Sequence, residues 1–225
     1  MIYLYHIRAN LSLSDRAYHD IRRMIVRLDL APGAVVREDL LQAELSLGRT
    51  PIREALQRLE RDQLVTVVPR RGVFVSNLDI GDLALLYETR SILEPYAMRL
   101  AAARGTDADW DEMATVLEQA TASSTPDELL AVDRRCREIV WDAAGNRFVR
   151  PTLDMLYAQS DRLWHLYLGD VADLHLMVSE HRAILAALRD RDGQRAASLI
   201  EAHMRRFDDQ IRDAVARRLN SPLAG

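Results

Sequence analysis

Two short basic segments of the sequence carry the side chains best suited to bind a polyanion. The first holds Arg49, Arg53 and Gln57, whose spacing of four residues places them on one face of a helix. The second is the turn Pro69-Arg70-Arg71-Gly72. A guanidinium group presents a planar fork of hydrogen-bond donors that matches phosphate oxygens and the edge of guanine. These segments therefore predict contact with DNA, against the alternative that each arginine is a solvated surface charge.

The residues around Arg53 predict the helix that would present it. The Thr50 hydroxyl can cap the first turn, and Pro51 suits the first helical position, where a missing N–H costs nothing. The apolar residues that follow recur at spacings of three and four and form one stripe opposite the polar face. They are Ile52, Ala55, Leu56 and Leu59.

The neighbouring segments complete a small domain around this helix. A first helix is expected to begin at Ser14 and to end before Ala31-Pro32-Gly33, and a short second helix to run from Glu38 to Leu45. Residues 64–75 predict two β-branched strands joined by the basic turn. The order helix, helix, turn, helix, hairpin is that of a winged helix-turn-helix.

This part of the chain resembles a known family. The run RTPIREALQRLERDQLV, followed by PRRGVFV, is similar to the DNA-binding domain of GntR-family transcription regulators. The family often places a serine or threonine that touches a phosphate just before the first arginine, where this chain has Gly48. The resemblance implies a DNA-contacting set of Arg49, Thr50, Arg53, Gln57, Arg70, Arg71 and Gly72.

Composition and charge divide the chain into two halves. Its 225 residues suit two modest domains, which we place at 1–77 and 78–225. The net charge of −4 splits into twelve Arg against nine acids before residue 78 and eighteen Arg against twenty-five acids after it, and no Lys occurs. The sequence has neither an apolar run long enough to span a membrane nor a leader, and its single Cys136 cannot form an internal disulfide. We therefore expect a cytoplasmic protein without membrane contact.

The second half predicts a bundle of helices without strands. A helix from Asp79 to about Arg104 would bury one apolar stripe, with Arg90 and Glu94 forming an i,i+4 pair beside it. Arg90 is either half of a surface pair or a clamp for a ligand carboxylate. The stripe consists of Leu83, Leu86, Ile92, Leu93, Tyr96, Ala97 and Leu100, and further helices are expected at about 107–121, 126–143, 147–168, 172–190 and 194–219.

This half resembles the FCD domain, the all-helical C-terminal domain of FadR-type GntR regulators. The resemblance rests on ETRSILE, DRRCREIVWDAAGN, SEHRAILAAL and EAHMRRF. It implies a dimeric sensor of organic or sugar acids that holds a divalent metal between an aspartate and three histidines. By resemblance, the ligand positions fall at Asp133, residue 137, His181 and His203.

Residue 137 departs from that pattern because it is arginine, which has no lone pair to offer a cation. Two alternatives follow. Asp133, His181 and His203 could hold Zn²⁺, Ni²⁺ or Mn²⁺ weakly, with water or an acid completing the shell, or Arg137 could pair with Asp133 and replace the metal. The second alternative is favoured. The predicted effector site then comprises Arg90, Asp133, Arg137, His181 and His203.

Together these observations predict a mostly α-helical protein, a winged helix-turn-helix followed by a helical bundle that senses a ligand and forms the dimer. The expected function is transcription regulation, with repression favoured, by a homodimer on double-stranded inverted-repeat DNA under control of a small organic acid. No enzyme activity is expected. The alternatives are a metal-dependent enzyme using Asp133, His181 and His203, and an adaptor that has lost DNA affinity.

Overall fold

The computed structural model describes residues 11–167 and 174–220, with side chains up to residue 217. The chain divides into two compact units, with the boundary between Ile80 and Gly81. Among the described residues, none of the helices combines the length and apolar character needed to cross a membrane.

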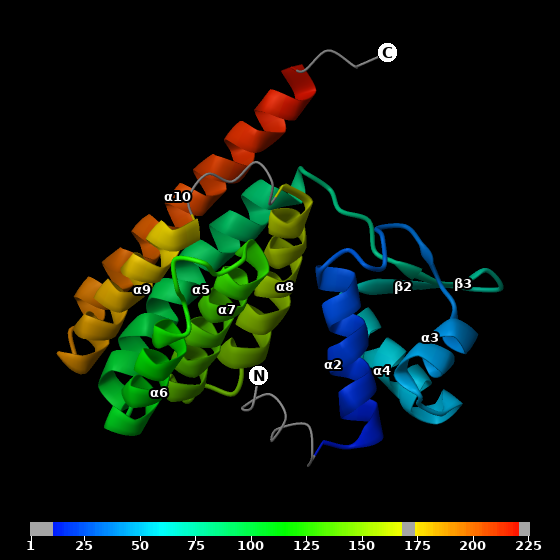
Figure 1. The fold of residues 1–225 in the computed structure, drawn as a ribbon, viewed down its shortest axis with the longest axis horizontal. Coiled ribbons are helices and arrows are strands. Elements are labelled where there is room, and N and C mark those ends of the chain that lie inside the picture. The colour runs from blue at the N-terminus through cyan, green and yellow to red at the C-terminus, as the bar shows by residue number, and fades with distance from the viewer. Residues whose placement is uncertain (1–10, 168–173, 221–225) are drawn as a thin grey trace. The chain divides into compact units, whose positions relative to one another are not determined.

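The first unit is a winged helix-turn-helix, as the sequence predicts (Figure 1). Its three strands form one antiparallel sheet in the order β1-β3-β2. The elements are α2 (Leu13–Val26), β1 (Val35–Val36), α3 (Glu38–Leu45), α4 (Arg49–Arg61), β2 (Val65–Val68) and β3 (Gly72–Val75).

The core of this unit follows the predicted stripe of α4. Ile52, Ala55, Leu56 and Leu59 are all buried, and α4 packs mainly on α2. Arg58 also joins the two helices, because its Nη1 donates to Asp15 Oδ1 at 2.6 Å and its guanidinium lies 4.1 Å from the centre of the Tyr18 ring. The α2–α4 pair is thus fixed by apolar burial on one side and by an ion pair on the other.

Two of the three expected helix starts in this unit shift by two residues, and the third, at Glu38, is unchanged. Ser12, and not Ser14, caps α2, because its Oγ accepts from the Asp15 backbone N–H at 3.1 Å. Helix α4 begins at Arg49 after Gly48, so Thr50 lies inside the helix and does not cap it. Pro51 is consequently the third helical residue, a position where its missing N–H still removes no helical hydrogen bond.

The second unit is all helical within the part of the chain that the structure describes. Helix α10 lies along α5 and α9 (Figure 1), and α6 and α7 begin with capping boxes at Thr106 and Thr125. The helices are α5 (Asp82–Arg104), α6 (Asp107–Glu118), α7 (Pro126–Ala143), α8 (Val149–Tyr167), α9 (Leu174–Arg189) and α10 (Gly193–Asn220).

Helix α5 differs from the expectation in two respects. It begins at Asp82, with Gly81 at the N-cap position, and not after Asp79. Two members of its predicted buried stripe, Ile92 and Tyr96, are exposed, Ile92 by 68%. Apolar residues occur on more than one face of this helix, so the spacing alone could not show which face packs inside the bundle.

Candidate functional site

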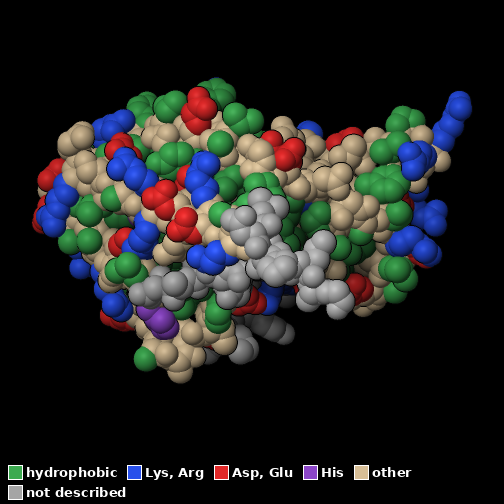
Figure 2. All heavy atoms as spheres, turned by 90° about the horizontal axis from the view of Figure 1, so that it is seen from above, with side chains coloured by type: hydrophobic (Ala, Val, Ile, Leu, Met, Phe, Trp, Pro, Cys, Tyr) green, Lys and Arg blue, Asp and Glu red, His purple; other side chains and the backbone are tan. Residues whose placement is uncertain are grey.

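All seven residues of the predicted DNA-contacting set are exposed on the first unit. Arg53 points outward from α4 and is held by Glu38 of α3, with Nε 2.9 Å from the carboxylate oxygen. This contact orients the guanidinium and leaves more than half of the side chain open to solvent. In Figure 2 the blue side chains, all Arg because the chain has no Lys, gather at the end of this unit that carries the β2–β3 turn.

The β2–β3 turn places two arginines at the tip of the wing. The Arg71 backbone N–H donates to Val68 O at 3.0 Å, which closes a four-residue turn around Pro69 and Arg70. Arg70 has φ +64° and Gly72 has φ +109°. A left-handed conformation is ordinary for glycine but costs an arginine about 1 kcal/mol. The chain therefore retains a long cation at a position that glycine would occupy with less strain.

The second unit contains a buried cluster of four charged groups contributed by α5 and α7. Arg137 Nε donates to Asp133 Oδ2 at 3.0 Å and its Nη1 to Glu94 Oε2 at 2.9 Å. Arg90 donates to the other oxygen of Glu94 through Nη2 at 2.7 Å and Nε at 3.2 Å. The Tyr157 hydroxyl on α8 also donates a hydrogen bond of 2.7 Å to Asp133 Oδ2. The two guanidiniums and two carboxylates form one continuous, electrically balanced chain.

The pKa values of Asp133, Glu94 and Arg137 follow from burial and from mutual attraction. Burial raises the pKa of Asp133, but the Arg137 charge and the hydrogen bond from His181 outweigh it and hold that pKa well below its ordinary value. The pKa of Glu94 is lowered in the same way, by Arg137 and Arg90 against burial. The pKa of the Arg137 guanidinium is raised, because the attraction of the two carboxylates exceeds the effect of burial. The two carboxylates and the Arg137 guanidinium are therefore ionised at neutral pH.

Two histidines meet the same aspartate from α9 and α10. His181 Nε2 lies 2.6 Å and His203 Nε2 lies 3.3 Å from Asp133 Oδ1. Burial lowers the pKa of His181 in spite of the aspartate, so its imidazole is neutral at neutral pH. Behind His203, the Glu180 carboxylate accepts from Nδ1 at 2.6 Å and is itself paired with Arg206. The three predicted ligand residues thus converge.

This convergence fits a divalent cation in part. His203 Nε2 is buried and makes no hydrogen bond among the described residues, while Glu180 holds the other ring nitrogen, Nδ1, and so fixes the orientation of the imidazole. Ligand atoms of Asp133, His181 and His203 lie within 4.8 Å of one another, so the group could hold a metal. The fourth position implied by resemblance belongs to Arg137, whose guanidinium already occupies the other oxygen of Asp133. That oxygen of Asp133 is therefore already paired with a positive charge and is not open to a cation.

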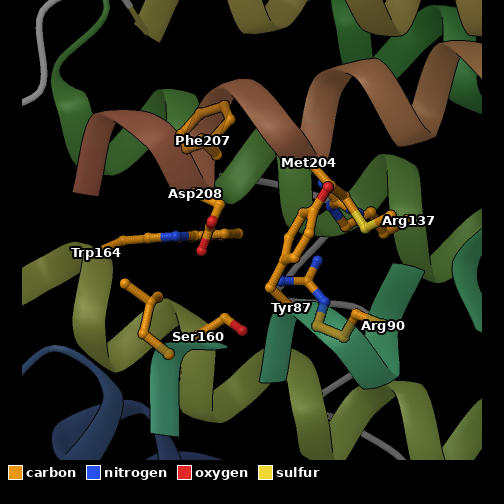
Figure 3. A pocket seen from close by; sticks show the side chains of 9 residues that line it. Tyr87, Arg90, Arg137, Ser160, Trp164, Met204, Phe207 and Asp208 are labelled. Atoms are coloured by element: carbon orange, nitrogen blue, oxygen red, sulfur yellow. The ribbon is translucent and has the colours of Figure 1, made fainter. Parts of the chain in front are cut away.

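A pocket opens beside this cluster, between α5, α8 and α10 (Figure 3). It encloses about 20 Å³, roughly the room of one water molecule, so a larger ligand must displace side chains. Figure 3 shows Trp164 and Asp208 on one side and Arg90 and Arg137 on the other. The remaining lining residues are Leu83, Tyr87, Ser160, Met204 and Phe207.

The structure brings all five predicted effector-site residues into this region and adds others that the sequence did not single out. Glu94 was expected as the partner of Arg90, but its second bond to Arg137, 43 residues away, joins two helices. Tyr157 and Glu180 support Asp133 and His203, and Asp208 lines the pocket. In the sequence, Glu180 directly precedes His181 and Asp208 follows His203 by five residues. Neither spacing places the acid on the same helix face as the histidine, so the sequence offered little indication of their roles.

Comparison with known families identifies the chain. Residues 13–75 match the model of the bacterial regulatory proteins of the gntR family, and residues 85–206 match that of the FCD domain. The protein belongs to the GntR family of transcription regulators and carries an FCD domain. The family consists of transcription regulators and not of enzymes, so the alternative of a metal-dependent enzyme using Asp133, His181 and His203 does not hold.

Individual relatives cover most of the chain. It is 29% identical over 85% of its length to the Nta operon transcriptional regulator of Aminobacter aminovorans, covering 91% of that protein. It is 28% identical to the transcriptional repressor GlaR of Escherichia coli, with 83% of this chain and 90% of that protein covered. In fold it is similar to Escherichia coli McbR/YncC, with a TM-score of 0.81 at 22% identity over 90% of this chain and 98% of the other.

Proposed function

We propose that this protein is a homodimeric repressor that binds an inverted-repeat operator and is released from it by a small organic acid in the FCD domain. The observation that carries this proposal is the balanced cluster of Arg90, Glu94, Arg137 and Asp133 beside the pocket. Repression is favoured because curated relatives such as GlaR and RspR of Escherichia coli are named repressors.

DNA would be read by α4 and held by the wing. Arg49, Arg53 and Gln57 are exposed on one face of α4, the position of a recognition helix in the major groove. Arg70 and Arg71 at the turn would contact phosphates, which fixes orientation without reading sequence. The Arg53–Glu38 contact would hold the guanidinium extended before DNA arrives, so less side-chain freedom is lost on binding.

The effector would enter the pocket as a carboxylate and compete for the buried arginines. Arg137 is shared by Asp133 and Glu94, and Arg90 is bonded to Glu94. A ligand carboxylate that takes a bidentate bond from one guanidinium must loosen one of these internal pairs. The cluster would then have two arrangements, one closed on itself and one open to ligand, and a ligand that binds only the open arrangement shifts the balance.

Asp133, His181 and His203 would hold a divalent ion if one binds. Such an ion would supply a Lewis-acidic attachment point for the acid. Because Arg137 places a positive charge beside Asp133, we propose that any Zn²⁺, Ni²⁺ or Mn²⁺ is held weakly and that the guanidiniums provide the main attraction for the ligand.

Dimerisation is proposed because one winged domain covers only a half-site and an inverted repeat needs two copies. The exposed apolar residues of α5, Leu85, Ile92 and Tyr96, occur at spacings of seven and four and so lie along one side of the helix. A row of large apolar side chains open to solvent is a common feature of subunit interfaces.

The test is a fluorescence-anisotropy titration of the full-length protein on DNA from upstream of its own gene, followed by a panel of organic and sugar acids. We expect specific binding, and at least one acid that raises the dissociation constant for DNA about tenfold in the parent but not in Arg90→Gln. Binding that no acid changes would contradict the ligand-controlled part, and equal binding of operator and scrambled DNA would contradict the whole proposal.

A further inference from the structure

The pocket of the FCD domain carries unmet polar groups of both signs. Arg137 Nη2 is a buried donor without a hydrogen-bond partner among the described residues, on a side chain that is 0% exposed. Asp208 Oδ1 is a buried acceptor that likewise lacks a partner in the described part of the chain, on a side chain that is 9% exposed. Both residues line the same pocket, and Figure 3 places them on opposite sides of it.

Contacts within α10 account for only one of the two carboxylate oxygens of Asp208. Its second oxygen, Oδ2, accepts from Arg212 Nε at 2.6 Å one turn further along α10, which leaves Oδ1 directed away from that pair. A buried carboxylate oxygen without a donor costs stability, and such an atom commonly marks a site completed by a ligand. A ligand donor at Oδ1 would remove that cost.

The charge of the pocket restricts the ligand further. Arg90 and Arg137 are already balanced by Glu94 and Asp133, all four being buried. An acid that brings only negative charge would leave a carboxylate uncompensated and would also face Asp208 across the pocket. A ligand that carries an ammonium as well as a carboxylate adds no net charge, because each of its charges meets an opposite one.

We propose that the effector is a zwitterion, an amino acid or a related amino-carboxylate, whose carboxylate binds Arg137 and Arg90 and whose ammonium binds Asp208. Trp164 and Phe207 lie beside Asp208 on the pocket lining, with ring centroids 5.3 Å apart. Their rings would exclude water from the ammonium and attract it through their faces. This inference rests on the proposed function, since it names the class of ligand that the effector pocket takes.

Calorimetric titration of the full-length protein tests the zwitterionic effector separately from the binding of an acid in general. The probes are the common amino acids, each paired with the acid of the same carbon skeleton without the amine, together with lactate and gluconate. We expect one amino acid to bind at least tenfold more tightly than its amine-free counterpart. Asp208→Asn should lose that preference and bind the amine-free acid as well as or better than the parent, a reversal that a folding defect would not produce.

Asp209→Asn is the matched control, because Asp209 is an exposed carboxylate on the neighbouring position of the same helix. It should keep the preference of the parent. Tight binding of amine-free acids by the parent, unchanged in Asp208→Asn, would overturn the zwitterion while leaving an acid effector in place. Binding of neither panel would overturn both.

Discussion

Replacing Arg137 with histidine tests what holds the ligand pocket together. The guanidinium lies 3.0 Å from Asp133 and 2.9 Å from Glu94, and none of the three side chains is more than 1% exposed. Removing one partner from a buried ion pair costs about 3–5 kcal/mol, because a buried charge is left without compensation. A domain of roughly 150 residues loses about 2–4 °C in melting temperature per kcal/mol, so the metal-free variant should melt about 6–20 °C below the parent.

The same substitution should create a metal site. An imidazole at position 137, one helical turn from Asp133, would complete the set that the family resemblance implies, with His181 and His203. Zn²⁺ at about one hundred times its dissociation constant should then restore about 2.7 kcal/mol. Thermal melts in chelator and in Zn²⁺, with metal analysis of protein purified without nickel resin, measure both effects.

Arg137→Leu serves as the control because it removes the same charge and offers no lone pair. It should show the loss of stability without the rescue by Zn²⁺. Two results would refute the reasoning: stoichiometric, tightly held metal in the parent, or an equal response of the histidine and leucine variants to Zn²⁺.

Three further substitutions or conditions follow from the geometry. Arg70→Gly should raise the stability of the wing by about 1 kcal/mol, since Arg70 has φ +64°. The same change should weaken DNA binding and make it less dependent on salt concentration, because one phosphate contact is lost. A loss of both stability in thermal melts and affinity in anisotropy would refute this. Ile92→Glu, on the exposed side of α5, should shift the mass in solution from about twice 25.6 kDa toward 25.6 kDa, and a persisting dimer in light scattering would place the interface elsewhere. Folding lowers the pKa values of Asp133 and Glu94, so the stability that these carboxylates contribute is complete above their ordinary pKa values of 3.8 and 4.5 and is lost as the pH falls below them. The free energy of unfolding of Glu94→Gln should therefore depend less steeply on pH below about 4.5. An unchanged slope in an acid titration followed by circular dichroism would count against the cluster.

Local periodicity explains the parts of the fold that the sequence predicted well. The stripe of α4 and the limits of α3 and α7 depend on spacings and capping residues within a few turns, and the structure has them where the pattern placed them. Strand β1 was missed because two residues, Val35 and Val36, are too short for any period and pair with β3 only through the tertiary fold.

The candidate site was less predictable, because its geometry depends on contacts between distant segments. The i,i+4 spacing indicated the Arg90–Glu94 pair, but no local signal showed that Glu94 is buried and bonded to Arg137 on another helix. Likewise, the sequence around Asp208 predicts only that it lies on a helix. That it lines the pocket with an oxygen lacking a hydrogen-bond partner among the described residues depends on how α10 packs in the bundle. The substitution of arginine for histidine at position 137, by contrast, was readable, and its predicted pairing with Asp133 is confirmed at 3.0 Å.

Arg53 is the side chain through which α4 would read operator DNA. Binding of the parent, Arg53→Ala and Arg61→Ala to DNA from upstream of the gene and to scrambled DNA should be measured by anisotropy at one fixed salt concentration. Arg61 is the control, an exposed arginine at the far end of the same helix. We expect Arg53→Ala to lose about 1–3 kcal/mol of specific binding with unchanged helix content, and Arg61→Ala to bind like the parent. Equal operator affinity of parent and Arg53→Ala would contradict the account.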